Sequence, residues 1–217
     1  VDADGVLSGS KFMVPDAAQA TWIAVVGSDA AGDAVVALVA GSDVTAQAQA
    51  SHALIDLTKR ASTLDFTGVK AQRVLSGDKV ASAIRDYLLI GALLTAAEAV
   101  GSTSACLAGI VDYLKTRKQF GKLIGSFQAL KHPTVDIYVG MEHSRSLVYH
   151  ASSEIDDGPL STEAEVACRM AKAKASDTIQ YAGDRSVQFH GGFGFTWECD
   201  SSLFIRRAAW SQQQFGD

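Results

Sequence analysis

Ser186-Val-Gln-Phe-His-Gly-Gly-Phe-Gly-Phe-Thr-Trp-Glu198 is the stretch that says most about the fold of this chain. It joins the polar end of a predicted helix to a cluster of three glycines, three phenylalanines and a tryptophan. Glycines let the backbone approach a ligand closely, because they carry no side chain. They do not form a dinucleotide-binding fingerprint, since they follow a helix instead of linking a strand to a helix, and the G-x-G-x-x-G spacing is absent.

A second motif, Arg117-Lys-Gln-Phe-Gly-Lys-Leu-Ile-Gly-Ser-Phe-Gln128, lies upstream. A guanidinium can bind phosphate oxygens with two parallel hydrogen bonds, and Phe120 can pack on a flat ring. Arg117 taken alone is typical of a cation in the last turn of a helix, where it suits the helix dipole. Its combination with Phe120-Gly121 and Phe127-Gln128 favours a ligand-binding role instead.

The chain changes character near residue 76. Before that point, short runs rich in Val, Ile and Ala alternate with turn residues, which predicts strands near 6–14, 21–26, 34–39 and 63–75. We therefore predict a small β-barrel-like domain over residues 1–76.

After Ser76 the apolar residues recur at helical spacing. The predicted helices run from Asp78 to near Phe120-Gly121, from Ser126 to about Ser153 with a kink at Pro133, from a Ser161 cap to about Phe189, and over about 203–214. These helices predict an antiparallel four-helix bundle over 77–217. The fold class is therefore α+β.

Composition excludes several functions. The formal net charge of −5 offers no basic footprint for nucleic acid. The three cysteines, Cys106, Cys168 and Cys199, have no metal-binding spacing, so we expect no metal site and a reduced, cytoplasmic setting. The most apolar run, 87–101, is interrupted by Glu98 and is shorter than the about 20 residues that a membrane span needs, so we expect a core helix.

The two motifs together resemble the acyl-CoA dehydrogenase family, a class of oxidoreductases that act on CH–CH bonds. The match continues through Thr196-Trp-Glu198 to Arg206-Arg207, which is similar to a bacterial branch with heteromeric steroid and acyl-CoA dehydrogenases. Nearly all 217 residues look like the middle β domain and the C-terminal bundle of the family. The family's N-terminal helical domain and the first part of its β domain have no counterpart in these residues.

The resemblance implies an FAD cofactor. In relatives, the motif arginine and phenylalanine meet the FAD diphosphate and adenosine of a neighbouring subunit, and the Q-x-x-GG motif approaches the same adenosine end. Carried over, the expected cofactor-binding residues are Arg117, Phe120, Gln128, Gln188, Gly191 and Gly192. The family strand that usually carries a tryptophan and a threonine against the flavin ring aligns with Lys11-Phe-Met-Val-Pro15.

The family's catalytic base has no obvious counterpart. In relatives a glutamate takes a proton from the α carbon of an acyl-CoA while a hydride leaves the β carbon for flavin N5. The family keeps this glutamate at one of two places, which fall on Gly91 and Phe215 here. Neither residue can accept a proton. Glu98 is the nearest carboxylate on the same predicted helix, about two turns away and too far for a simple replacement.

Three hypotheses follow. The first is an FAD-dependent acyl-CoA dehydrogenase subunit that lacks the base and completes the FAD site of a partner. The second is an active homo-oligomer with a relocated base, such as Glu98. The third is a flavin-free structural homologue. The resemblance also implies an acyl-CoA substrate, assembly as a dimer of dimers, homomeric or heteromeric, and electron-transfer flavoprotein as electron acceptor.

Overall fold

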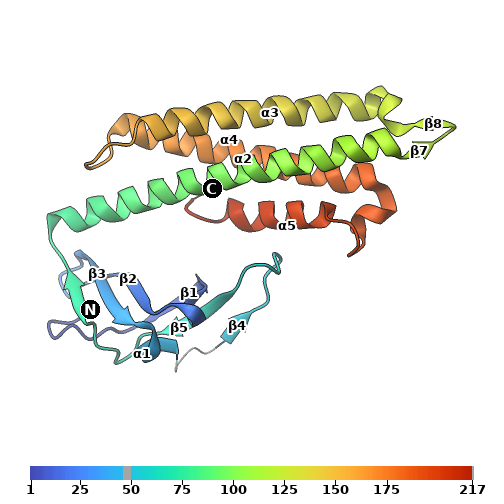
Figure 1. Cartoon of the computed structure of the whole chain (residues 1–217). Helices are drawn as coiled ribbons and strands as arrows, with labels where there is room; N and C mark the ends of the chain where they lie inside the picture. The colour runs from blue at the N-terminus through green and yellow to red at the C-terminus, as the bar shows by residue number, and fades with distance from the viewer. Residues whose placement is uncertain (46–49, 217) are drawn as a thin grey trace. The chain divides into compact units, whose positions relative to one another are not determined.

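The computed structural model describes residues 1–45 and 50–216 (Figure 1). Its contacts separate two compact units, Val1–Arg85 and Asp86–Asp217, and each unit is described by itself. The division falls inside the first long helix. The predicted boundary at 76/77 instead lies just before this helix begins at Asp78.

Strands that pair only antiparallel make up the first unit. They are β1 (Ser10–Pro15), β2 (Trp22–Ser28), β3 (Ala34–Ala40), β4 (Ala50–His52), β5 (Ala61–Asp65) and β6 (Arg73–Leu75). One sheet has the order β1-β5-β4 and the other the order β2-β3-β6. A short helix, α1 (Gly41–Thr45), follows β3, and a 3₁₀ turn, η1 (Ala17–Gln19), follows β1.

The two sheets are not closed into a barrel, which corrects the barrel-like prediction. Within the described residues, β1 pairs with β5 and β2 with β3, so no ladder joins the two sheets. Their buried residues pack together instead, with Val25 and Val39 from one sheet against Leu64 from the other. A shared apolar core of this kind holds two sheets together without edge-to-edge pairing.

The first strand begins later than its apolar pattern suggests. Val6 makes only an isolated bridge to Lys70, and β1 starts at Ser10, after Gly9 with a φ of 110°. The register of β1 on β5 shifts between Lys11 and Val14, and Met13 between them has a φ of 57°. This irregularity falls in the segment that the resemblance places near a flavin ring.

The second unit is a helical bundle. Its helices are α2 (Asp78–Thr116), α3 (Gln128–Ser153), α4 (Thr162–His190) and α5 (Ser201–Gln212). Ser161 caps α4 as expected, because its side chain accepts a hydrogen bond from the Ala164 amide at 3.0 Å. Buried residues from α2, α3 and α4, such as Leu93, Ala151 and Ala171, form its main core.

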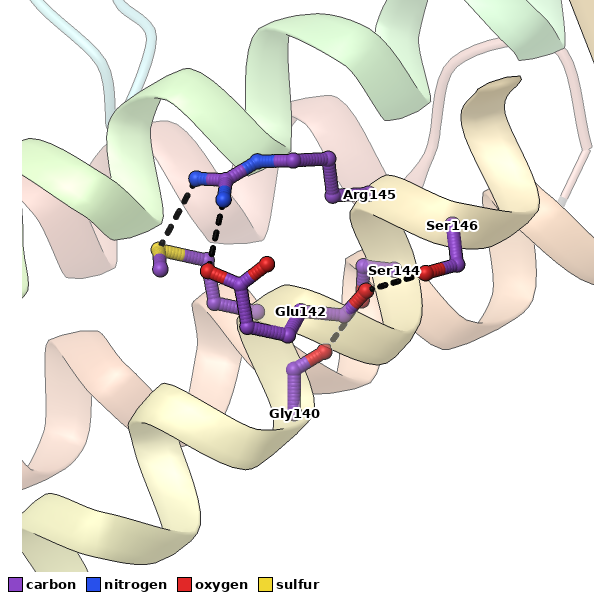
Figure 2. Close-up of polar contacts among 6 residues, drawn as sticks. Gly140, Glu142, Ser144, Arg145 and Ser146 are labelled. Atoms are coloured by element: carbon purple, nitrogen blue, oxygen red, sulfur yellow. Dashed lines mark hydrogen bonds and ion pairs between the residues drawn. The ribbon is translucent and has the colours of Figure 1, made fainter.

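Serines and threonines also join the helices. Ser144 of α3 donates to the Gly140 carbonyl at 2.8 Å and lies 3.2 Å from the Thr178 hydroxyl of α4. Figure 2 shows the surrounding turn of α3, where Arg145 reaches Glu142 at 2.6 Å. This ion pair between residues three apart on one helix is half-exposed, so it contributes about 0.5 kcal/mol at most.

α2 ends earlier than predicted, at Thr116, and Arg117 lies outside its last turn. The chain turns back as a small hairpin, β7 (Lys118–Gln119) and β8 (Lys122–Leu123), followed by the 3₁₀ turn η2 (Ile124–Ser126). Phe120 and Gly121 have φ values of 54° and 76°, the left-handed pair that a two-residue hairpin turn requires. The sequence Phe-Gly therefore marks a hairpin tip beyond the helix.

By length and composition alone, α2 could cross a membrane, which corrects the expectation of a run that is too short. This is weak evidence for a span, since the core helix of a soluble bundle passes the same test. α2 contributes Leu89, Leu93, Ala96 and Ala99 to the bundle core.

Candidate functional site

A groove of about 930 Å³ lies where the end of α2, the hairpin and the end of α4 meet. Among its lining residues are Tyr113, Arg117, Phe120, Phe127, Gln188, His190, Gly191, Gly192 and Phe193. The structure thus brings together five of the six predicted cofactor-binding residues, from segments far apart in sequence. Gln128 is the exception, although its neighbours Phe127 and Ala129 line the groove.

Arg117 is positioned by its backbone while its side chain stays exposed. Its amide donates to the Tyr113 carbonyl at 2.9 Å, and its carbonyl accepts from the Ile124 amide at 2.9 Å. In the part of the chain that the structure describes, its guanidinium has no hydrogen-bond or ion-pair partner. A fixed backbone with a free guanidinium suits the binding of an anionic group, because no existing pair must be broken.

The glycine cluster continues the wall of the groove. Gly191 ends α4 with a φ of 61°, and a side chain at Gly191 or Gly192 would meet no atom within 4 Å. The backbone here is therefore open to a flat ligand. Gly194 differs, since a Cβ there would lie 2.5 Å from the Val187 carbonyl oxygen, so this glycine lets the η3 turn (Gly191–Phe195) pack on α4.

Tyr113 and His190 are among the lining residues that were not predicted as ligand contacts. Their rings stack with centroids 4.1 Å apart, and the His190 Nδ1 lies 2.8 Å from the Ser186 carbonyl and 2.9 Å from the Ser201 hydroxyl. These contacts give His190 the role of a hydrogen-bonded structural histidine. Tyr113 precedes Arg117 by one helical turn, which was the available signal that it shares the same face.

An apolar core supports the groove from below, with Cys106, Ile110, Ile137 and Phe189 among its buried members. Burial raises the pKa of the Cys106 thiol to about 11, because the thiolate would lose its solvation. The Cys106 thiol lies 3.5 Å from the Ala182 carbonyl of α4. This cysteine therefore joins α2 to α4 as a small buried residue. None of the described residues forms a cluster that could hold a metal ion.

The two predicted base positions come together in space. The ring of Phe215, just beyond α5, lies against Gly91 of α2, and a Cβ at Gly91 would be 2.3 Å from its Cδ1. The Tyr87 ring meets the same Phe215 ring edge to face at 5.8 Å. The structure thus brings Gly91 and Phe215 side by side, and neither side chain can accept a proton.

Glu98 lies elsewhere and is already paired. Its carboxylate forms an ion pair with Arg207 of α5. This ion pair holds the carboxylate of Glu98 against α5. Glu98 therefore fits a role in joining α2 to α5.

Comparison with known proteins assigns the family. The model of the acyl-CoA dehydrogenase C-terminal domain matches residues 81–216. This chain belongs to the acyl-CoA dehydrogenase family. The acyl-CoA dehydrogenase IpdE2 of Mycolicibacterium smegmatis is 40% identical over 125 residues, which are 58% of this chain and 38% of that protein.

Two solved structures extend the match across both units. Butyryl-CoA dehydrogenase from Megasphaera elsdenii superposes with a TM-score of 0.87 at 26% identity and covers 97% of this chain and 56% of its own. A chain of the ChsE4–ChsE5 complex from Mycobacterium tuberculosis has a TM-score of 0.82 at 25% identity, covering 95% of this chain and 54% of its own. The chain thus spans little more than half the length of these relatives.

Proposed function

We propose that this chain is part of an FAD-dependent acyl-CoA dehydrogenase and that its bundle supplies the adenosine-side groove for the cofactor. The observation that carries the proposal is the convergence of Arg117, Phe120, Gln188 and the Gly191-Gly192 backbone on one groove. Gln128, beside this groove, belongs to the proposed set on the resemblance alone. When bound, FAD supplies a hydride acceptor for the β carbon of an acyl-CoA.

The residues of the groove fit the adenosine diphosphate part of FAD. The free Arg117 guanidinium matches phosphate oxygens, and the exposed Phe120 ring offers a flat surface. The open backbone at Gly191 and Gly192 accepts a planar group without a clash. The Gln188 amide adds a neutral donor and acceptor.

The same subunit, we propose, does not remove the α proton. Gly91 and Phe215 fill both family base positions, and Glu98 pairs with Arg207. The chain is then the base-lacking member of a heteromer whose partner subunit carries the glutamate. One structural relative of this chain comes from the ChsE4–ChsE5 complex, which is named for two different proteins.

The wider role follows the family. The substrate class is an acyl-CoA thioester, from fatty-acid or steroid degradation, and electron-transfer flavoprotein is the proposed electron acceptor. The proposed domains are the middle β domain over residues 1–76 and the C-terminal four-helix bundle over 77–217. The proposed assembly is a dimer of dimers in the cytoplasm.

The test is to purify the full-length protein alone and together with the products of neighbouring genes. Flavin absorbance and oxidation of acyl-CoA substrates are then measured for both preparations. We expect stoichiometric FAD and turnover only with a partner that carries a glutamate at the position matching Gly91 or Phe215. Stoichiometric FAD with acyl-CoA oxidation by the chain alone would contradict the helper role, and a colourless complex would contradict flavin binding altogether.

A further inference from the structure

The contact between Gly91 and Phe215 leaves no room for a side chain on α2. A Cβ at Gly91 would lie 2.3 Å, 2.4 Å and 2.7 Å from the Cδ1, Cε1 and Cγ atoms of Phe215. Distances under 3.0 Å are essentially never seen for real Cβ atoms. Rotation of the ring about its own axis does not move Cγ, so either the ring would have to swing to another χ1 rotamer or the segment after α5 would have to shift.

That segment is held in place by Lys172 of α4. Its side chain is only 2% exposed, and its ammonium donates to the Gln212 carbonyl at 2.9 Å and the Gly216 carbonyl at 2.6 Å. Carbonyls at the end of a helix lack partners inside the helix and attract a cation. Lys172 therefore ties both ends of the 212–216 segment to the bundle, with Phe215 between them.

The backbone of the segment turns so that the Phe215 ring lies against Gly91. Phe215 has a φ of 57° and Gly216 a φ of 97°, in the left-handed region that a phenylalanine rarely adopts. Such a conformation persists only where the surroundings hold it. Here the Lys172 hydrogen bonds and the edge-to-face contact with Tyr87 do so.

We propose that Phe215, fixed by Lys172, closes the acyl position of this bundle, so that this subunit excludes an acyl-CoA thioester while its FAD groove stays open. The inference rests on the proposed function, which places the reacting carbons beside Gly91 and Phe215. The two family base positions share one space here, and the ring fills it. Gly91 and Phe215 are therefore a coupled pair, and a side chain can return to α2 only if the ring leaves.

A double-mutant cycle in the full-length protein tests the coupling by urea unfolding. Gly91→Ala should lower the unfolding midpoint in the natural background and raise it in a Phe215→Ala background, because alanine is the better helix former once the ring is gone. Gly101→Ala is the matched control, since a Cβ at this α2 position meets nothing within 4 Å, and it should raise the midpoint in both backgrounds. The same sign for Gly91→Ala in both backgrounds would overturn the coupling.

Calorimetric titration with butyryl-CoA tests the closure, with the FAD content of each variant read from its absorbance. Phe215→Ala should bind butyryl-CoA at least about tenfold more tightly than the natural protein. Phe215→Leu keeps an apolar side chain at this position and serves as a second variant in case the alanine variant misfolds. Its affinity for butyryl-CoA should lie between those of the other two proteins. Equal affinity of all three proteins would overturn the closure. Lack of FAD in the assembly with the partner subunit would instead contradict the proposed function, while the unfolding cycle would still decide the coupling.

Discussion

Two regions of the bundle treat a ligand differently. At the groove, an arginine without a partner, an exposed aromatic ring and bare glycine backbone face solvent. Around Gly91, an aromatic ring fills the space and a buried lysine fixes the segment that carries it. The groove can receive a ligand, whereas the Phe215 ring occupies the space beside Gly91. Under the proposed function, this contrast assigns cofactor binding to this subunit and proton removal to its partner.

Arg117→Ala in the groove should produce the largest effect, a loss of FAD affinity. Loss of a charge-assisted pair with phosphate costs about 1.5–3 kcal/mol, so we expect FAD affinity to fall about 10- to 100-fold in the assembled protein. Fluorescence titration of the apoprotein with FAD measures this. Arg169→Ala is the control, because Arg169 pairs with Glu165 on α4 and does not line the groove. Equal losses for both variants would mean that the groove is not the FAD site.

Lys172→Met tests whether Lys172 holds the segment that carries Phe215. Methionine keeps most of the buried chain but loses the two hydrogen bonds to the Gln212 and Gly216 carbonyls. We expect the free energy of unfolding to fall by about 2 kcal/mol and the amides after α5 to exchange faster with solvent. Lys174→Met on the same helix should change unfolding by less than about 0.5 kcal/mol. If Lys172→Met left amide exchange at 213–216 unchanged, Lys172 would not be what holds Phe215.

The smallest expected effect is the pH dependence of stability that comes from Cys106. Its folded pKa of about 11 lies above the ordinary value of 9.0, so the fold favours the neutral thiol. The stabilisation it contributes is complete below about pH 9 and is lost as pH rises toward about 11. Alkylation at mildly alkaline pH, read by mass spectrometry, should spare Cys106 in the native protein and modify it in urea. Rapid native alkylation would show that the core under the groove opens.

Much of the bundle was predictable from sequence. The Ser161 cap marked the start of α4, and the apolar spacing indicated α2 and α3. The wrong predictions concern where the helices end and whether the sheets close into a barrel. α2 ends before the hairpin because Phe120-Gly121 adopts left-handed backbone, and the sheets stay open because pairing across them is decided by long-range packing.

The candidate site divides in the same way. The family resemblance carried by the local motifs indicated five residues of the groove, and the chemistry of the arginine, the aromatic residue and the paired glycines supported it. The same alignment of motifs showed that both base positions lack a carboxylate. Lys172 gave no signal, because a lysine in a helical pattern is usually exposed and its partners lie some forty residues further along the chain.

The sequence by itself therefore determined the order of the bundle helices, and it indicated the family and the lack of an ionisable group at Gly91 and Phe215. It missed β4 and α1, and it joined β5 and β6, which lie in different sheets, into one predicted strand. Only the tertiary structure decided that those two residues touch, that Lys172 fixes them, and that Glu98 is paired with Arg207. The physical reason is range. Caps, turns and apolar periodicity act between residues a few positions apart, whereas the closure beside Gly91 depends on packing among α2, α4 and the segment after α5.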